Sequence, residues 1–246
     1  MTIFLEACVD SVESSIAAEQ GGAGRLELCA DLIEGGTTPT AGMLEVVRHS
    51  VRIPIHVMIR PRGGDFCNTP AEFEVMRRDI VVAKNAGADG VVFGLLTPEG
   101  EIDVERTRTL TAEARPLKVT FHRAFDMARD PHAALEALIA LGIERVLTSG
   151  QEQTALEGID LIATLVRQAD ERIIVMPGGG IHERNVRKVA AQSGAREIHA
   201  SARTTVDGPM AYRNRRAFMG GELRPAEFSR SVSDPVRVRA IRDACD

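Results

Sequence analysis

Two short segments near the amino terminus each place a carboxylate and a thiol two residues apart. Glu6 and Cys8 lie in LEACVD, and Glu27 and Cys29 lie in LELCAD. Side chains two residues apart in a strand share one face, so each segment would present an acid and a thiol together. A buried carboxylate is costly unless it is paired or faces a wet pocket, where it can exchange protons with a ligand. The pattern therefore predicts either an ion-pair network or a site of acid–base chemistry.

Two further strand-like segments end in charged residues. In RPRGGDF, the guanidinium groups of Arg60 and Arg62 are suited to binding a carboxylate or phosphate through paired hydrogen bonds. Structural salt bridges to acids such as Asp65 are the alternative. In TFHRAFD, His122 and Asp126 could form an acid–base pair, and a helix N-cap is the alternative for Asp126.

Glycines and small polar residues follow the last two strand-like runs, in MPGGGI and HASAR. Barrels often bind phosphate in the loops after strands seven and eight, through backbone N–H groups that glycine leaves accessible. A tight turn is the alternative for the glycine triplet. The full set of anion-binding candidates is Arg60, Arg62, Arg123, Ser149, Gly178, Gly179, Gly180, Ser201 and Arg203.

A regular alternation of strands and helices would position these residues. Helix-like segments end in glycine and lead within two or three residues into a strand, as in NAGADGVVFG and ALGIERVLTSG. Helices are expected at 11–20, 71–86, 131–141 and 183–193, and the first three have a Ser, Thr or Asp before them as an N-cap. Strand-like runs lie at residues 3–9, 25–30, 53–60, 90–96, 117–122, 144–149, 172–177 and 196–201.

Eight such units in about 200 residues favour an α/β fold with a single (β/α)8 TIM barrel. We expect one domain over residues 1–246, with a mixed carboxyl-terminal tail and helix from about residue 204.

Strand parity predicts a polar barrel interior. One face of each run is apolar, as with Leu5, Ala7 and Val9, and must meet the helices. The opposite faces carry polar groups that would point into the lumen: Glu6, Glu27, Glu197, His56, His122 and His199. Titratable groups gathered in this way are typical of a functional site, although a structural ion-pair network also explains them.

The composition excludes several classes of function. The net charge is −5 and no basic run is present, so we expect neither nucleic acid nor an anionic membrane as a partner. The first residues lack a signal-peptide pattern, and no apolar run is long enough to span a membrane. We therefore expect a cytoplasmic protein. Its four cysteines form no CxxC pair and are expected to be reduced.

The segments LEACVDSVES, ELCADLIEGGTTPT, RPRGGDF, TFHRAFD, RVLTSGQ and MPGGGI resemble the CutC copper homeostasis family over almost the whole chain. The resemblance implies a TIM barrel, a homodimer or higher homo-oligomer, and a role in copper tolerance. It also implies Cu(I) as the bound metal, with Cys8 and Cys29 as its ligands. Both thiols would point inward from neighbouring strands, as a soft ion with few thiolate ligands requires.

The sequence leaves three functions open. The first is Cu(I) binding without catalysis. The second is an enzyme acting on a small anionic or phosphorylated metabolite, with Glu6, Glu27 and His122 as catalytic residues and the anion-binding candidates holding the substrate. The third is an oligomeric scaffold with a vestigial cavity, in which lumen substitutions change only stability.

Overall fold

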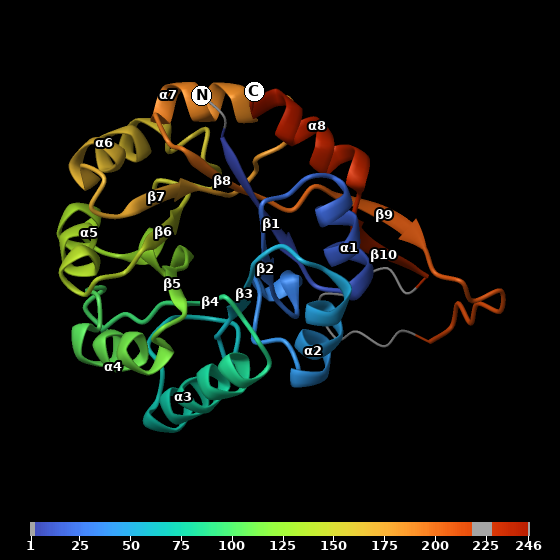
Figure 1. The fold of residues 1–246 in the computed structure, drawn as a ribbon, viewed down its shortest axis with the longest axis horizontal. Coiled ribbons are helices and arrows are strands. Elements are labelled where there is room, and N and C mark those ends of the chain that lie inside the picture. The colour runs from blue at the N-terminus through green and yellow to red at the C-terminus, as the bar shows by residue number, and fades with distance from the viewer. Residues whose placement is uncertain (1–2, 218–227, 246) are drawn as a thin grey trace.

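Eight parallel strands alternate with helices around a central barrel (Figure 1). The computed structural model describes residues 3–217 and 228–245. Each expected strand-like run contains one strand, which confirms the predicted (β/α)8 barrel. The strands are β1 (Phe4–Val9), β2 (Arg25–Leu28), β3 (Ile55–Met58), β4 (Gly90–Phe93), β5 (Lys118–Phe121), β6 (Arg145–Thr148), β7 (Ile174–Pro177) and β8 (Glu197–Ala200).

The helices form the outer layer of the barrel (Figure 1). The side chains of Ser11, Thr69 and Asp130 each accept a backbone N–H of the helix that follows, which confirms the three predicted N-caps. Two short 3₁₀ helices lie at the carboxyl ends of β2 and β5, at Leu32–Glu34 and Arg123–Met127. The longer helices of the ring are α1 (Val12–Gln20), α2 (Ala41–Ser50), α3 (Pro70–Asn85), α4 (Val104–Ala114), α5 (Pro131–Ala140), α6 (Ile159–Ala169) and α7 (Val186–Ser193).

The sheet has a seam between its last two strands. The hydrogen-bonded order of the described strands is β7-β6-β5-β4-β3-β2-β1-β8, so β8 pairs with β1 and no ladder joins β7 to β8. The two strands still lie close together. A Cβ atom on Gly178, directly after β7, would lie 3.2 Å from the Cβ of His199 in β8, so the seam is narrow there.

The chain after the barrel forms a two-stranded ribbon and a helix. Strands β9 (Arg203–Asp207) and β10 (Ser229–Ser233) are antiparallel, and α8 (Pro235–Cys245) lies beside α1 and α7 (Figure 1). The ribbon is attached to the barrel through the Ser233 amide, which donates to Ser14 Oγ at 3.0 Å. The tail expected from about residue 204 thus contains this ribbon and α8, and its residues 218–227 lie outside the described range. Among the described residues, no helix has the length and apolar character needed to cross a membrane.

The two faces of the strands differ as parity predicts. Leu5, Ala7 and Val9 of β1 belong to the large apolar core between the strands and the helices. The opposite faces turn into the lumen, where Glu6, Glu27 and His56 are each at most 3% exposed. The burial of apolar surface between strands and helices is the main driving force for this fold.

Two arginines and two glutamates fill the amino-terminal half of the lumen. Arg25 donates to Glu6 and, at 2.7 Å, to Glu197, while Arg145 donates to both oxygens of Glu197 at 2.6 and 3.1 Å. The charges of this layer cancel. Burial raises the pKa of both glutamates, but their partners outweigh it and hold each pKa below its usual range. These partners are Arg25 and His199 for Glu6, and Arg145 and Arg25 for Glu197.

Strand β4 leaves room for two histidines. A Cβ atom on Gly90 would lie 2.5 Å from the ring of His56, and one on Gly94 would lie 2.6 Å from the Nδ1 atom of His122. Residues 90, 92 and 94 share the face of β4 that points into the lumen. The two glycines on this face carry no side chain, and the space that they leave is occupied by the histidine rings of the neighbouring strands.

We expect Gly90→Ala to lower the free energy of unfolding by about 1–3 kcal/mol, because the new methyl group must displace the His56 ring. Gly42→Ala is the control, since no atom lies within 4 Å of its added Cβ in α2. This control should leave the free energy of unfolding unchanged or raise it by at most about 0.5–1 kcal/mol, since Gly42 lies in the first turn of the helix. Urea unfolding of both variants measures the difference, and a neutral Gly90→Ala would contradict the tight packing at His56.

We expect Arg25→Leu to cost about 3–5 kcal/mol at pH 7, since it leaves buried carboxylates without their partner. Arg108→Leu is the control, because its ion pair with Glu105 is exposed and should be worth about 0.5 kcal/mol.

The lowered pKa of Glu6 and Glu197 means that their stabilisation is present above the unfolded-state pKa of 4.5 and is lost as the pH falls below it. The difference in the free energy of unfolding between wild type and Arg25→Leu should therefore become smaller when urea unfolding is measured at acid pH. If Arg25→Leu and Arg108→Leu lowered the free energy of unfolding equally at pH 7, the buried ion pairs would contribute no more than a surface ion pair.

Candidate metal centre

Three potential ligands converge above the charged layer. Cys8 of β1, Glu27 of β2 and His199 of β8 each place a ligand atom within 4.8 Å of the other two. The register explains the convergence, because Cys8 is level with Glu27 in one ladder and Glu6 is level with His199 in the other. The three groups are therefore brought together by the strands themselves and not by flexible loops.

The His199 ring is fixed by a carboxylate beneath it. Its Nδ1 atom lies 2.8 Å from Glu6 Oε1, and Arg25 binds the other oxygen of Glu6. Since Glu6 is ionised, Nδ1 is the donor, and the Nε2 atom is directed toward Glu27, 3.7 Å away. Burial lowers the pKa of His199, but the charges of Glu27 and Cys8 and the hydrogen bonds to Cys8 and Glu6 raise it well above its ordinary value.

The two cysteines of the opening motifs meet in the lumen. Cys29 lies two residues beyond the level of Cys8, directly after β2, and the two side chains belong to one buried cluster. The Cys29 thiol and His199 stabilise the Cys8 thiolate and lower the pKa of Cys8 to about 5 in spite of its burial. The neighbouring Cys8 thiolate and burial raise the pKa of the Cys29 thiol well above its ordinary value. Cys8 is thus the thiolate of the pair and Cys29 the thiol.

Glu27 lies beside both sulfur atoms. Its Oε2 atom is 3.5 Å from the Cys29 Sγ atom, while its Oε1 atom is buried without a hydrogen-bond partner among the described residues. Burial raises the pKa of Glu27 well above the ordinary value. Met58 and Val92 pack against the two cysteines and close this part of the lumen.

Two adjoining cavities open at the carboxyl end of the barrel. One has a volume of about 270 Å³ and is lined by Glu27, Met58 and His122, among others. The other has a volume of about 260 Å³ and lies at the ends of β7 and β8. Both are bounded by Cys8, Arg123 and His199. The candidate ligands therefore lie where a small molecule or an ion can enter.

His122 and Asp126 do not form the expected acid–base pair. The His122 Nδ1 atom accepts the Ala124 N–H, so the neutral ring carries its proton on Nε2, and burial together with Arg60 lowers its pKa to about 3. Asp126 is not a helix N-cap either. It accepts the Ser149 amide at 3.0 Å and the Gln151 amide at 3.2 Å, and so holds the loop after β6.

The anion-binding candidates divide into two groups. Arg60 donates to the backbone carbonyls of Glu34, Gly36 and Gly64. Arg62 forms the structural salt bridges of the alternative interpretation, to Asp65 at 3.0 Å and to Glu72 at 2.7 Å. Ser149 is buried, and its hydroxyl binds Asp126. The Gly178 amide donates to the Thr148 carbonyl at 2.9 Å, so it is not available to an anion. Five others line the second cavity at its mouth or walls: Arg123, Gly179, Gly180, Ser201 and Arg203.

The residues of the enzyme hypothesis are separated by the fold. Glu27 and His122 line the first cavity, whereas Glu6 lines neither cavity and is fully buried in its ion pairs. Sequence reasoning assigned no site role to His199, although its parity with Glu197 already turned it inward. Arg25 and Arg145 were also missed, and their parity with Glu27 and Leu147 would have placed them in the lumen.

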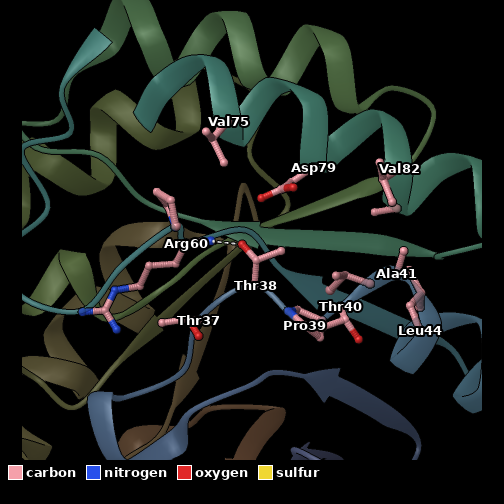
Figure 2. Close-up of a pocket in the computed structure, with 13 residues that line it drawn as sticks. Thr37, Thr38, Pro39, Thr40, Ala41, Leu44, Arg60, Val75, Asp79 and Val82 are labelled. Atoms are coloured by element: carbon pink, nitrogen blue, oxygen red, sulfur yellow. Dashed lines mark hydrogen bonds between the residues drawn. The ribbon is translucent and has the colours of Figure 1, made fainter. Parts of the chain in front are cut away.

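A further groove lies outside the barrel, between α2 and α3 (Figure 2). Val75 and Val82 of α3 flank it, and the carboxylate of Asp79 points into it, where burial raises its pKa. The Arg60 amide donates to Thr38 Oγ1 at this groove, but Figure 2 shows that the guanidinium extends away from it. The groove is therefore separate from the cysteine cluster.

Comparison with known proteins agrees with the resemblance seen in the sequence. The family model described as "CutC family" matches residues 3–204. The copper homeostasis protein cutC homolog of Homo sapiens is 57% identical over 238 residues, which cover 97% of this chain and 87% of that protein. The CutC family protein of Chromobacterium violaceum is 49% identical over 246 residues, covering 100% of this chain and 99% of the relative.

Solved structures show the same barrel. The structure of CutC from Streptococcus agalactiae has a TM-score of 0.77 and 33% identity, covering 80% of this chain and 98% of that one. Thiamine phosphate pyrophosphorylase from Pyrococcus furiosus, at 18% identity, has a TM-score of 0.60 over 99% of this chain and 95% of its own, and shares the fold alone. The match of the family model and the identity to full-length relatives lead to one conclusion: this chain belongs to the CutC family of copper homeostasis proteins.

Proposed function

We propose that the protein binds one Cu(I) ion in the barrel lumen, with Cys8, Cys29 and His199 as its ligands. The observation that carries this proposal is the meeting of the Cys8 sulfur atom and the His199 ring nitrogen beside Glu27, all within 4.8 Å of one another. The Cys29 sulfur atom lies 3.5 Å from the same carboxylate. Membership of a copper homeostasis family and the printed names of the relatives support copper as the metal.

The chemistry of the donors favours a soft ion. Thiolates select Cu(I), and imidazole is also a good ligand for copper. Cys8 supplies a thiolate at neutral pH, because Cys29 and His199 lower its pKa to about 5. Binding must displace a proton from Cys29 and from His199 Nε2, so copper affinity rises with pH.

The surroundings of His199 match those of a metal-bound histidine. Such histidines usually donate their second N–H to a carboxylate, which fixes the ring and strengthens the free nitrogen as a ligand. Glu6 takes this role here, at 2.8 Å from Nδ1, and is itself held by Arg25. The buried ion-pair layer thus aims the His199 Nε2 atom at the thiols.

Glu27 has a supporting role in this proposal. Carboxylate oxygen is a hard donor that suits other metals better than Cu(I). Its Oε2 atom lies 3.5 Å from the Cys29 Sγ atom, and its carboxylate lies within 4.8 Å of the Cys8 Sγ atom. We therefore assign Glu27 to positioning the two sulfur atoms.

We expect wild-type protein to bind one Cu(I) per chain in an anaerobic competition titration against a chromophoric Cu(I) chelator. Cys8→Ser and Cys29→Ser should each weaken binding by at least about a hundredfold, since the loss of outer-shell partners alone commonly costs 10–100-fold. The double variant Cys8→Ser/Cys29→Ser should not compete with the chelator.

Cys67→Ser is the matched control, because Cys67 is a free, half-buried thiol outside the cluster. It should bind copper as the wild type does. Circular dichroism of each variant separates a lost site from a lost fold. If the folded double variant retained wild-type affinity, the cysteine pair would not be the copper site.

A further inference from the structure

We propose that the cavity at the ends of β7 and β8 binds the phosphate group of a small molecule. Five of the residues that line this cavity, which we call the oxyanion pocket, would bind the phosphate: Arg123, Gly179, Gly180, Ser201 and Arg203. Cys8 and His199 also bound the cavity, but the proposal does not depend on copper, because the five phosphate-binding residues are not among the proposed metal ligands.

Unused backbone donors are the first support for the oxyanion pocket. No ladder joins β7 to β8, so the chain leaving these strands is not tied by strand pairing across the seam. Within residues 3–217 and 228–245, the amides of Gly179, Gly180 and Ser201 donate to no backbone or side-chain acceptor. Backbone N–H groups in loops after these strands are typical ligands of phosphate in barrels.

Arg123 provides a fixed positive charge on one side of the pocket. Its Nε atom donates to Asp126 at 2.7 Å and its Nη2 atom donates to Ser149. The Nη1 atom has no partner among the described residues, and a Cβ on Gly179 would lie only 3.5 Å from it. The anchored guanidinium therefore presents its free edge to the glycine loop.

Arg203 provides a second charge, at the start of β9. Its Nη2 atom contacts Asp10 at 3.3 Å, whereas its Nε atom is buried without a hydrogen-bond partner among the described residues. The hydroxyl of Ser201, two residues earlier, is also unpartnered in the described part of the chain. The Arg203 side chain lines the pocket, so a bound anion would add a charge-assisted partner to a guanidinium that now contacts Asp10.

The number of donors favours phosphate over carboxylate. Three amides, one hydroxyl and two guanidinium edges surround the pocket, and a phosphate monoester presents three terminal oxygens where a carboxylate presents two. The pocket volume of about 260 Å³ holds a phosphate with a few further atoms. Because Cys8 and His199 bound both cavities, the rest of such a molecule would lie toward the metal centre.

Calorimetric titration of the metal-free protein with inorganic phosphate, sulfate and acetate at low ionic strength tests the proposal. We expect phosphate and sulfate to compete for one site and acetate to bind at least about tenfold more weakly. Arg123→Gln and Arg203→Gln should each weaken phosphate binding about tenfold or more, since a hydrogen bond to a charged group is worth roughly a factor of ten.

Arg62→Gln is the matched control, an arginine at the barrel mouth whose donors are already engaged by Glu72 and Asp65. It should bind phosphate as the wild type does. Cys29→Ser, at a residue that lines neither cavity, should also retain phosphate binding while it weakens copper binding, which separates this proposal from the copper site. If Arg123→Gln fails to fold, phosphate binding by Arg203→Gln still tests the proposal.

Three outcomes would overturn the proposal. They are no phosphate binding by the wild type, full binding by a folded Arg203→Gln variant, or a loss in Arg62→Gln equal to that in Arg203→Gln. Acetate binding as tight as that of phosphate would overturn the assignment to phosphate and identify a carboxylate ligand.

Discussion

The carboxylate of Glu6 is the group on which the interior of this barrel depends. It is fully buried, and it accepts a hydrogen bond from Arg25 on one oxygen and from His199 on the other. An isolated carboxylate at this depth would take up a proton or destabilise the fold. Glu6 therefore stays ionised only because the charged layer below and the cluster above both contact it, and it couples structural stability to the geometry of the candidate metal centre.

The charges in the amino-terminal half of the lumen are paired, whereas some buried polar atoms toward its carboxyl end have no hydrogen-bond partner among the described residues. Arg25 and Arg145 neutralise Glu6 and Glu197, with most of their donors used. Toward the carboxyl end, buried polar atoms without partners among the described residues begin to occur, at Glu27 Oε1 and at the Nε atoms of Arg60 and Arg203. Since native interiors leave few buried polar groups unpaired, this change marks the boundary between the groups that hold the barrel together and those available to ligands.

The sequence was sufficient to predict the strands and their faces, because alternation is local and each βα unit ends in recognisable turn residues. It was insufficient wherever a side chain's partner comes from a distant strand. The role of Asp126 depends on the loop after β6, and that of His199 depends on Glu6, 193 residues away. The β9–β10 ribbon was not foreseen either, since RTTVD and SRSVS lack a regular apolar alternation and pair only across a long connection. Parity predicts which residues face one another, but only the register and the barrel closure decide which of them touch.

The seam between β7 and β8 gives a physical reason why both proposed ligands lie at one end of the barrel. Where the ladder is missing, backbone donors remain free, and the neighbouring His199 is positioned by Glu6 and not by a partner in β7. The two cavities share Cys8, Arg123 and His199 as walls, so a ligand in either cavity changes the electrostatic surroundings of the other. By thermodynamic linkage, any effect of an anion on copper affinity must equal the effect of copper on anion affinity. A metal site fixed by strands and an anion pocket fixed by loops would then form one coupled unit, held in register by the buried ion pairs beneath them.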